Sequence, residues 1–198
     1  MKTMQPLDEQ DRQFLLRLAR RSVEEAAAGR PPAQAKPESP VLLEPRGAFV
    51  TLKARGQLRG CIGHVVPSQP LHRTVCECAH LAAIRDPRFD PVRPPEVPSL
   101  RIEISVLSTL AAIRPDQIEV GRHGLMVTMG LRRGVLLPQV PIEWNWDRER
   151  FLAETCLKAG LDADAWRRGA RIEAFTAEAF SEQPDAAFSN ASGWPAAS

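Results

Sequence analysis

The sequence predicts an α+β protein with a mainly antiparallel sheet flanked by helices. Segments with helical spacing and segments with strand alternation are interleaved along the chain. Short turns separate most neighbouring strand segments, and such turns favour antiparallel pairing over parallel crossovers. The 198 residues are enough for one domain, or for a domain with a small second lobe.

The N-terminal region is predicted to form a helix followed by an extended connector. Asp8 has the side chain of a helix N-cap, and apolar residues recur after it at helical spacing until Gly29. The next stretch contains five prolines, which prevent a helix and favour extended chain. We therefore expect a proline-rich connector at about residues 30–45.

A β-hairpin is predicted next. Two β-rich runs surround a turn at residues 55–56. If this two-residue turn sets the register, Cys61 lies opposite Val50 and Arg59 lies opposite Leu52. These partners are apolar, so the register bears on whether Cys61 is a core residue.

The remainder of the chain alternates between helix and strand patterns, and its last residues, 183–198, are predicted to be a disordered tail. The predicted elements are, in order, a helix at 69–85, a proline-rich loop at 86–98, a strand at 99–108, short strands within 118–140, a helix capped by Asp147, and one late strand at 170–180.

Composition and charge exclude several classes of protein. Apolar residues make up 43% of the chain, which is enough for a folded core. The net charge is +2 with no concentrated basic cluster, which argues against a nucleic-acid binder. No apolar run approaches the roughly 20 residues that cross a bilayer, and the N-terminus lacks the apolar core of a signal peptide. We expect a soluble cytoplasmic protein whose four cysteines are reduced thiols.

The stretch LRGCIGHV is the first candidate site. In a regular strand Arg59, Cys61 and Gly63 share one face, while Gly60 and His64 share the other. A guanidinium beside a thiol favours the thiolate, which is the reactive form of cysteine. Glycines leave backbone amides uncovered, so a small anion held by Arg59 and a backbone N–H is an equally good interpretation.

A purely structural role for Cys61 is also consistent with the sequence. Free cysteine is commonly buried as a small hydrophobic residue, and glycine in a strand often marks a bulge or tight packing. No base close in the sequence completes a Cys–His arrangement, because His64 points to the opposite face of a regular strand.

The loop DPRFDP holds a second group of candidate residues. Asp86, Arg88 and Asp90 can form a polar clamp beside the hairpin. They can equally cap and neutralise the turns of a proline-rich loop, which is a common use of aspartate.

The helix sequence HRTVCECAH raises the question of a metal site. His72, Cys76 and His80 share a helical face, but the outer two are about 12 Å apart along the axis, too far for one ion. A closed zinc site would need ligands from elsewhere. Nucleotide-binding, zinc-protease and iron–sulfur motifs are absent from the sequence as well, so we predict no metal and no cofactor.

Several blocks taken together resemble the AMMECR domain family. The blocks are LRGCIG, DPRFDPV, RIEISVLS, GRHGLMV, GVLLPQV, FLAETCLKAGL and AEAFSE, in that order. They span roughly residues 8–182, and LRGCIG is the family's signature. More narrowly, the chain resembles the branch called AmmeMemoRadiSam system protein A.

The resemblance implies a fold, a site and companions. It implies one domain over residues 1–182 with two lobes, and a cleft between the lobes that LRGCIG lines. The companions implied are a Memo-type protein and a radical SAM protein, although a shared system does not itself define a reaction. The matching site positions are Leu58, Arg59, Gly60, Cys61, Ile62, Gly63, Asp86, Arg88 and Phe89.

Two functions are consistent with these residues. In the first, the cleft around LRGCIG binds a partner segment or a small anionic ligand, which His64, Asp86 and Arg88 help to position. In the second, Cys61 is a catalytic nucleophile or covalent carrier, activated by Arg59, in a modification pathway with the radical SAM companion. We prefer the first because the sequence offers no acid–base partner for Cys61.

Overall fold

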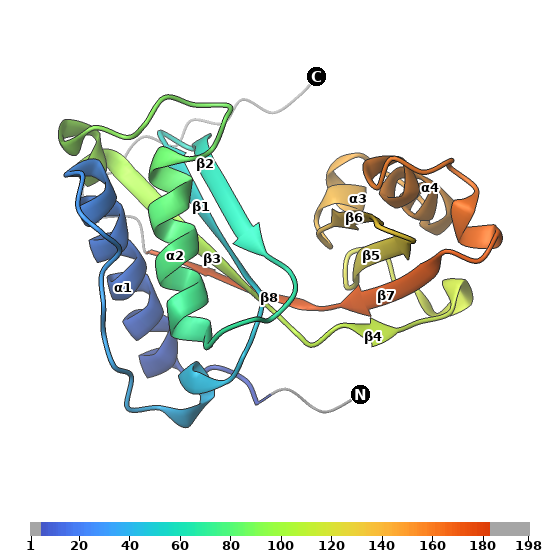
Figure 1. Cartoon of the computed structure of the whole chain (residues 1–198), viewed down its shortest axis with the longest axis horizontal. Helices are drawn as coiled ribbons and strands as arrows, with labels where there is room; N and C mark the ends of the chain where they lie inside the picture. Colours follow the sequence, from blue (N-terminus) through green and yellow to red (C-terminus); the bar gives the residue numbers. More distant parts are fainter. Residues whose placement is uncertain (1–4, 183–198) are drawn as a thin grey trace, which may run out of the picture.

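The computed structural model describes residues 5–182 and has two lobes, each built on its own four-stranded antiparallel sheet (Figure 1). The first lobe holds the N-terminal half of the chain and the last strand. The second lobe holds the residues between them. In both lobes helices cover one face of the sheet, which confirms the predicted α+β class.

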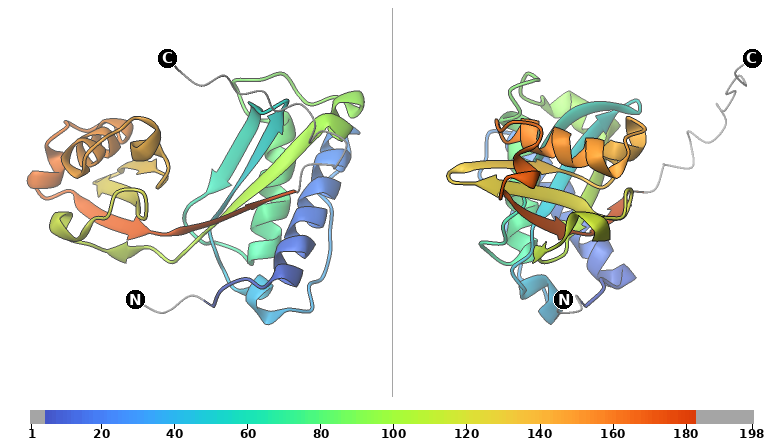
Figure 2. Two further views of the ribbon diagram at one scale, coloured as in Figure 1. Left: turned by 180° about the vertical axis from the view of Figure 1, so that it is seen from behind. Right: turned by 90° about the vertical axis from the view of Figure 1, so that its right-hand side faces the viewer.

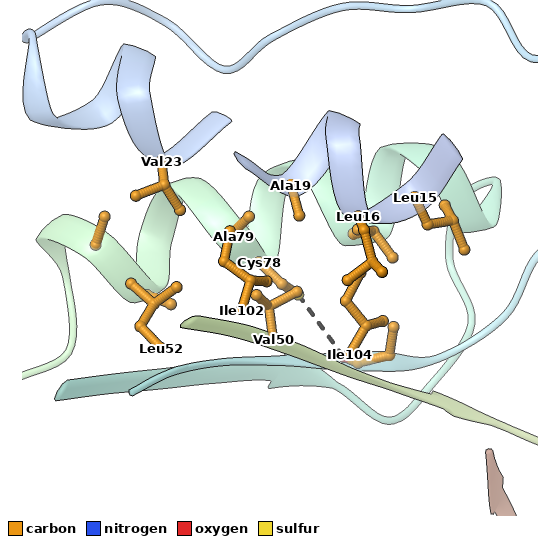
Figure 3. Close-up of a cluster of buried hydrophobic side chains, with 14 of the residues drawn as sticks. Leu15, Leu16, Ala19, Val23, Val50, Leu52, Cys78, Ala79, Ile102 and Ile104 are labelled. Carbon is orange, nitrogen blue, oxygen red and sulfur yellow. Dashed lines mark hydrogen bonds between the residues drawn. The ribbon is translucent and has the colours of Figure 1, made fainter. Parts of the chain in front are cut away.

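The sheet of the first lobe has the strand order β2-β1-β3-β8, so β2 is an edge strand. The helices α1 and α2 lie side by side on one face of this sheet (Figures 1 and 3). The elements are α1 (Glu9–Ala27), β1 (Ala48–Ala54), β2 (Gln57–His64), α2 (Leu71–Ile84), β3 (Leu100–Leu107) and β8 (Ala177–Ser181).

The core of the first lobe lies between the two helices and the sheet (Figure 3). Leu15 and Val23 of α1 and Ala79 of α2 meet Val50 and Ile104 of the sheet, and all five side chains are fully buried. Alternate residues of β1 and β3 point into this core, as period-two patterning requires. Among residues 5–182, no helix lies on the opposite face of this sheet (Figure 1).

Asp8 begins α1 as predicted, because its side chain accepts a hydrogen bond from the Asp11 N–H at 2.7 Å. After α1 the connector returns along the helix layer to the 3-10 helix η1 (Pro40–Leu43) (Figure 1). The loop predicted at 86–98 is likewise not wholly irregular, because it ends in the 3-10 helix η2 (Pro94–Ser99). Short helices of this kind tolerate proline at their first positions, where its missing N–H is not needed.

The sheet of the second lobe has the strand order β4-β7-β5-β6 and is covered by α4. Phe151 and Leu152 of α4 are fully buried against Leu125 of the sheet. Asp147 caps α4 as predicted, accepting from the Arg150 N–H at 2.7 Å. The elements are β4 (Ala111–Ala112), η3 (Pro115–Gln117), β5 (Gly124–Met129), β6 (Arg132–Leu136), α3 (Val140–Glu143), α4 (Arg148–Lys158), η4 (Ala165–Arg167) and β7 (Arg171–Phe175).

Two neighbouring segments join the lobes (Figure 2). One leads from β3 to β4 and the other from β7 to β8. Ser108 and Thr176 tie the two segments together, through a bond from the Ser108 N–H to the Thr176 carbonyl and one from the Thr176 N–H to the Ser108 hydroxyl, both 2.9 Å.

The strand predicted over 170–180 is therefore two strands in two different sheets, with Thr176 at the break. The predicted tail at 183–198 lies outside the described residues. Within residues 5–182, no helix combines the length and apolar character needed to cross a membrane.

Candidate functional site

A β-bulge in the hairpin decides where the LRGCIG side chains point. Leu52 pairs with Gly60 and Lys53 pairs with Leu58, so Arg59 is an extra residue without a partner on β1. Cys61 therefore lies opposite Thr51. The predicted register, which placed Val50 there, was wrong by one residue because it assumed a regular strand.

The change of register places Cys61 on the uncovered face of the sheet. Four polar residues follow one another across its four strands, because Cys61 pairs with Thr51, Thr51 with Glu103, and Glu103 with Ser181. We call this row and its surroundings the Cys61 face. The Thr51 hydroxyl donates a hydrogen bond to the Cys61 sulfur at 3.3 Å. Cys61 is half-buried, so the thiol is not sealed in the core.

The two glycines of the motif have different roles. Gly60 is buried against α2, and a β-carbon there would collide with the carbonyl oxygen of Ala82. The missing side chain of Gly60 thus makes room for the helix, and not for a ligand as the sequence suggested. Gly63 lies on the Cys61 face, where the ring of Phe49 occupies the space that a β-carbon would need.

Asp86 fastens the loop after α2 to the motif. Its buried carboxylate accepts a hydrogen bond from the Cys61 N–H at 2.8 Å and another from the Arg88 N–H at 3.1 Å. It also forms a two-point ion pair with the Arg88 guanidinium, at 2.9 Å from Nε and 2.7 Å from Nη2. The hydrogen bonds from Arg88, followed by those from the two backbone N–H groups, hold the pKa of Asp86 well below its usual range.

Arg88 is the cation that Asp86 holds beside the Cys61 backbone. Its side chain is 54% exposed, although two of its nitrogens are held by Asp86. The pKa of Arg88 is raised, chiefly by the hydrogen bonds to Asp86 and to a smaller extent by the electrostatic influence of Asp86 and Cys61. Asp86 and Arg88 thus pair beside Cys61, whereas Asp90, the third residue of the predicted clamp, contributes its backbone carbonyl to Arg59.

Arg59 is engaged by the loop after α2, and its predicted role at Cys61 stays a prediction. Its guanidinium binds Glu96 at 3.0 Å and the carbonyl oxygen of Asp90 at 3.0 Å, and it lies 5.9 Å from the centre of the Phe89 ring. The bulge turns this side chain towards the loop after α2. Arg59 therefore braces that loop, while Arg88 is linked to the Cys61 backbone through Asp86.

His64 lies near Glu77 of α2, with 3.8 Å between Nε2 and the nearest carboxylate oxygen. Glu77 already accepts a hydrogen bond from the Gln69 amide at 2.6 Å. His64 has the same strand parity as Gly60, which packs on α2. It therefore belongs to the opposite side of β2 from Cys61, as the alternation predicted.

The other three thiols differ from Cys61 in burial. Cys76, Cys78 and Cys156 are all buried, and burial raises the pKa of each thiol, for Cys78 to about 12. A raised pKa leaves little thiolate at neutral pH, so these three are poor nucleophiles. Cys61 is the only half-buried thiol among the four cysteines, all of which lie in the described part of the chain.

Neither a metal cluster nor an enclosed cavity marks the Cys61 face. Among residues 5–182, no three His, Cys, Asp or Glu side chains gather in a way that could hold a metal ion. Two cavities stand out in the same range, and LRGCIG lines neither of them. The motif lies on an open sheet face, and the predicted cleft at LRGCIG stays a prediction.

Comparison with known proteins identifies the family. The family model described as AMMECR1 matches residues 16–180. This chain belongs to the AMMECR1 family. A relative from Thermococcus gammatolerans is 48% identical over 187 residues, covering 86% of this chain and 90% of that protein. Protein TK0174 from Thermococcus kodakarensis is 44% identical over 184 residues, with the same coverage of 86% and 90%.

A solved AMMECR1-family structure agrees with the fold. The crystal structure of uncharacterized protein PH0010 from Pyrococcus horikoshii has a TM-score of 0.78 to this chain at 44% sequence identity, covering 86% of this chain and 90% of that one. These names state no activity, so the function of this AMMECR1-family chain has to be argued from its site. Sequence reasoning missed Thr51 and Glu96 there, because both come to the site through the bulge, which the local pattern does not reveal.

Proposed function

We propose that this protein is a binding module whose Cys61 face holds a partner segment or a small anionic ligand. The observation that carries the proposal is the fixed, half-exposed guanidinium of Arg88 beside Cys61. Asp86 engages Nε and Nη2, whereas Nη1 has no hydrogen-bond partner among residues 5–182. A guanidinium that is held in place and still has a free N–H donor is suited to recognising a carboxylate or phosphate.

Binding fits the geometry better than catalysis does, because acid–base partners are remote from Cys61. His64 belongs to the other side of the strand. The nearest carboxylate in the polar row is Glu103, two strands away, and strands lie about 4.8 Å apart, so the separation is about 10 Å. Asp86 is occupied by its four donors.

The partner segment that we propose comes from the companions of an AmmeMemoRadiSam system, a Memo-type protein or a radical SAM protein, in the cytoplasm. The support for this part is the likeness of the motif blocks, and it is independent of the argument from Arg88. A flat sheet face with a cation and a row of polar groups is also better suited to a protein segment than to an enclosed metabolite.

The proposal can be tested by measuring binding of the purified Memo-type and radical SAM proteins of the same organism to four variants. Arg88→Ala should weaken binding at least about tenfold, the loss expected for one charge-assisted contact, whereas Arg88→Lys should recover part of it. Cys61→Ser should bind like the unaltered protein. Arg133→Ala, which changes an exposed arginine on the second lobe, is the matched control. Unaltered binding by Arg88→Ala would contradict the proposal.

The second candidate is an enzyme that uses Cys61 as a nucleophile or covalent carrier. One observation favours it, namely that the Thr51 hydroxyl donates to the thiol while the Asp86–Arg88 pair is hydrogen-bonded to the Cys61 N–H. Incubation with candidate substrates and the radical SAM companion should then leave an adduct on Cys61, detected by intact-mass spectrometry. If Cys61→Ser supports the same overall conversion, Cys61 is not the nucleophile.

A further inference from the structure

A cavity of about 940 Å³ lies on the first lobe between the connector and the helix layer. We call residues 31–37, which form its outer wall, the strap. Figure 1 shows this part of the chain running from the end of α1 back along the helices. The volume falls within the range of about 300–1,000 Å³ typical of small-molecule sites. LRGCIG contributes no residue to this cavity, so an occupant would be independent of the function proposed above.

The strap is fixed in place, so the cavity exists without a ligand. The Cys76 thiol of α2 donates to the carbonyl oxygen of Ala33 at 2.5 Å and lies 3.0 Å from the Ser22 hydroxyl of α1. Ala33 itself is buried. Three of the seven strap residues are proline, which restricts the backbone on either side of this anchor.

The walls of the cavity are largely apolar. Leu18 of α1, Leu43 of η1 and Pro70 before α2 face the prolines of the strap across it. Leu43 is 47% exposed, although it is a large apolar residue. Such a surface favours an occupant with an apolar body.

Two unpaired cations line the same cavity. The side chains of Lys36 on the strap and Arg73 on α2 have no hydrogen bond or ion pair with any residue between 5 and 182, and both residues are exposed. The one lining carboxylate, Glu77, accepts a hydrogen bond from the Gln69 amide at 2.6 Å and keeps its negative charge. The two cations outnumber this carboxylate, so the lining carries a net positive charge beside an apolar wall.

His72 adds a buried polar group to the lining. It is only 8% exposed, and its Nδ1 lies 3.0 Å from the carbonyl oxygen of Leu42. A carbonyl oxygen accepts, so Nδ1 carries the proton and Nε2 is the acceptor in the neutral ring. A ligand hydroxyl or amide can donate to this Nε2.

We propose that the cavity between the strap and the helices binds a small organic anion with an apolar body, of the medium-chain carboxylate class. Lys36 and Arg73 hold the anionic group, and the leucines and prolines cover the apolar body. An acidic peptide is less suitable because the strap encloses one side of the cavity and the lining offers few backbone partners. A flat bilayer surface cannot reach Cys76 at the base of the cavity.

The test is isothermal titration of the full-length protein with dodecanoate. Dodecanoate should bind, while dodecyltrimethylammonium, which has the same chain and the opposite charge, should bind at least about tenfold more weakly. The double variant Lys36→Glu/Arg73→Glu should lose dodecanoate binding by at least the same factor. The matched control Arg133→Glu/Lys158→Glu makes the same charge change on exposed residues of the second lobe and should bind normally.

Two further measurements separate this site from others. Cys61→Ser should bind dodecanoate like the unaltered protein, because Cys61 does not line the cavity. Ala35→Trp, at an exposed lining position, should weaken binding by filling the cavity while leaving the fold intact. The proposal is overturned if dodecanoate does not bind, if the two double variants bind it equally, or if the protein instead sediments with phosphatidylglycerol vesicles.

Discussion

A single buried carboxylate organises the candidate site. Asp86 is 3% exposed at its side chain, and it joins the backbone of β2 to the loop that carries Arg88. A charge in this position is stable only because every lone pair that points into the protein meets a donor. The position of Arg88 beside Cys61 is therefore a consequence of Asp86.

We predict that Asp86→Asn destabilises the protein by about 2 kcal/mol at neutral pH. Asparagine keeps an acceptor for the Cys61 N–H but loses the two-point ion pair with Arg88. Because the Arg88 side chain is exposed to solvent, losing the pair lowers the free energy of unfolding only moderately. Urea unfolding of the two proteins gives the difference. Asp90→Asn, which changes an exposed carboxylate of the same loop, is the control and should cost little.

The pH dependence of the stability difference between Asp86→Asn and the unaltered protein shows whether the charge of Asp86 causes it. Because the pKa of Asp86 is lowered in the folded protein, its ionisation stabilises the fold above the unfolded-state value of about 3.9. This contribution is lost as pH falls towards the folded-state pKa. The stability gap between Asp86→Asn and the unaltered protein should therefore shrink on acidification, and a gap that stayed constant to low pH would rule out the charge as its source.

The four cysteines should react with iodoacetamide at very different rates. Cys61 is half-buried, whereas the pKa of each of the other three thiols is raised by burial. We expect Cys61 to be alkylated first in the folded protein, by at least about tenfold at neutral pH, and all four to react alike in denaturant. Peptide mapping by mass spectrometry measures both. Equal labelling of Cys61 and Cys156 in the folded protein would argue against an accessible thiol.

At the scale of elements, the strand β2 depends on its glycines in two different ways. At Gly60 an added methyl meets backbone of α2, which cannot move without shifting the helix. We predict a loss of about 3 kcal/mol for Gly60→Ala. At Gly63 the added methyl meets the Phe49 ring, which can turn aside, so Gly63→Ala should cost only about 1 kcal/mol. Thermal unfolding of both variants measures these losses.

Gly63 and Phe49 supply an internal check. In the Phe49→Leu background Gly63→Ala should lose less stability, because the smaller leucine side chain leaves room for the added methyl. A double-mutant cycle would measure this coupling. No coupling is expected between Phe49 and Gly60, which lie on opposite faces of the sheet. Equal coupling for both glycines would contradict the assignment of the two faces.

The sequence predicted most elements but not how β2 pairs with β1. Both helices of the first lobe, the hairpin and its turn follow from local spacing and capping, which are properties of neighbouring residues. At the bulge, Gly60 packs on α2 and Arg59 pairs with Glu96, and both partners are distant in the sequence. One extra residue moved Cys61 from a predicted apolar partner to Thr51 and turned Arg59 towards the loop after α2.

At the scale of the whole molecule, the division into two sheets could not be read from the strand patterns. The strand pattern over residues 170–180 looks continuous, yet β7 and β8 belong to different lobes because the chain crosses over at Thr176. Alternation tells which side chains point inwards, but not which core they enter. The resemblance to a known family supplied the expectation of two lobes, whereas the residues alone supplied only the α+β class.

Separate cores should make the two lobes respond separately to core mutations. The buried cluster around Phe151 and Leu125 shares no member with the cluster that contains Ile104. We predict that Phe151→Leu, at a fully buried position, destabilises the second lobe by about 1–2 kcal/mol. Amide exchange should then quicken across β5, β7 and α4, while β1 and β3 keep their protection.

Ile104→Val is the matched substitution in the first lobe and should give the opposite pattern, with faster exchange in β1 and β3 and unchanged exchange in α4. The reason is that, in the described residues 5–182, two adjacent segments tied to each other at Ser108 and Thr176 join the lobes, and no large interface packs one lobe on the other. A loss of packing in one core therefore has little surface through which to spread. Hydrogen exchange followed by mass spectrometry resolves both patterns on the same peptides. If either substitution accelerates exchange equally in both sheets, the lobes form one cooperative unit, and Arg88 and Cys61 would then be sensitive to changes in the second lobe as well.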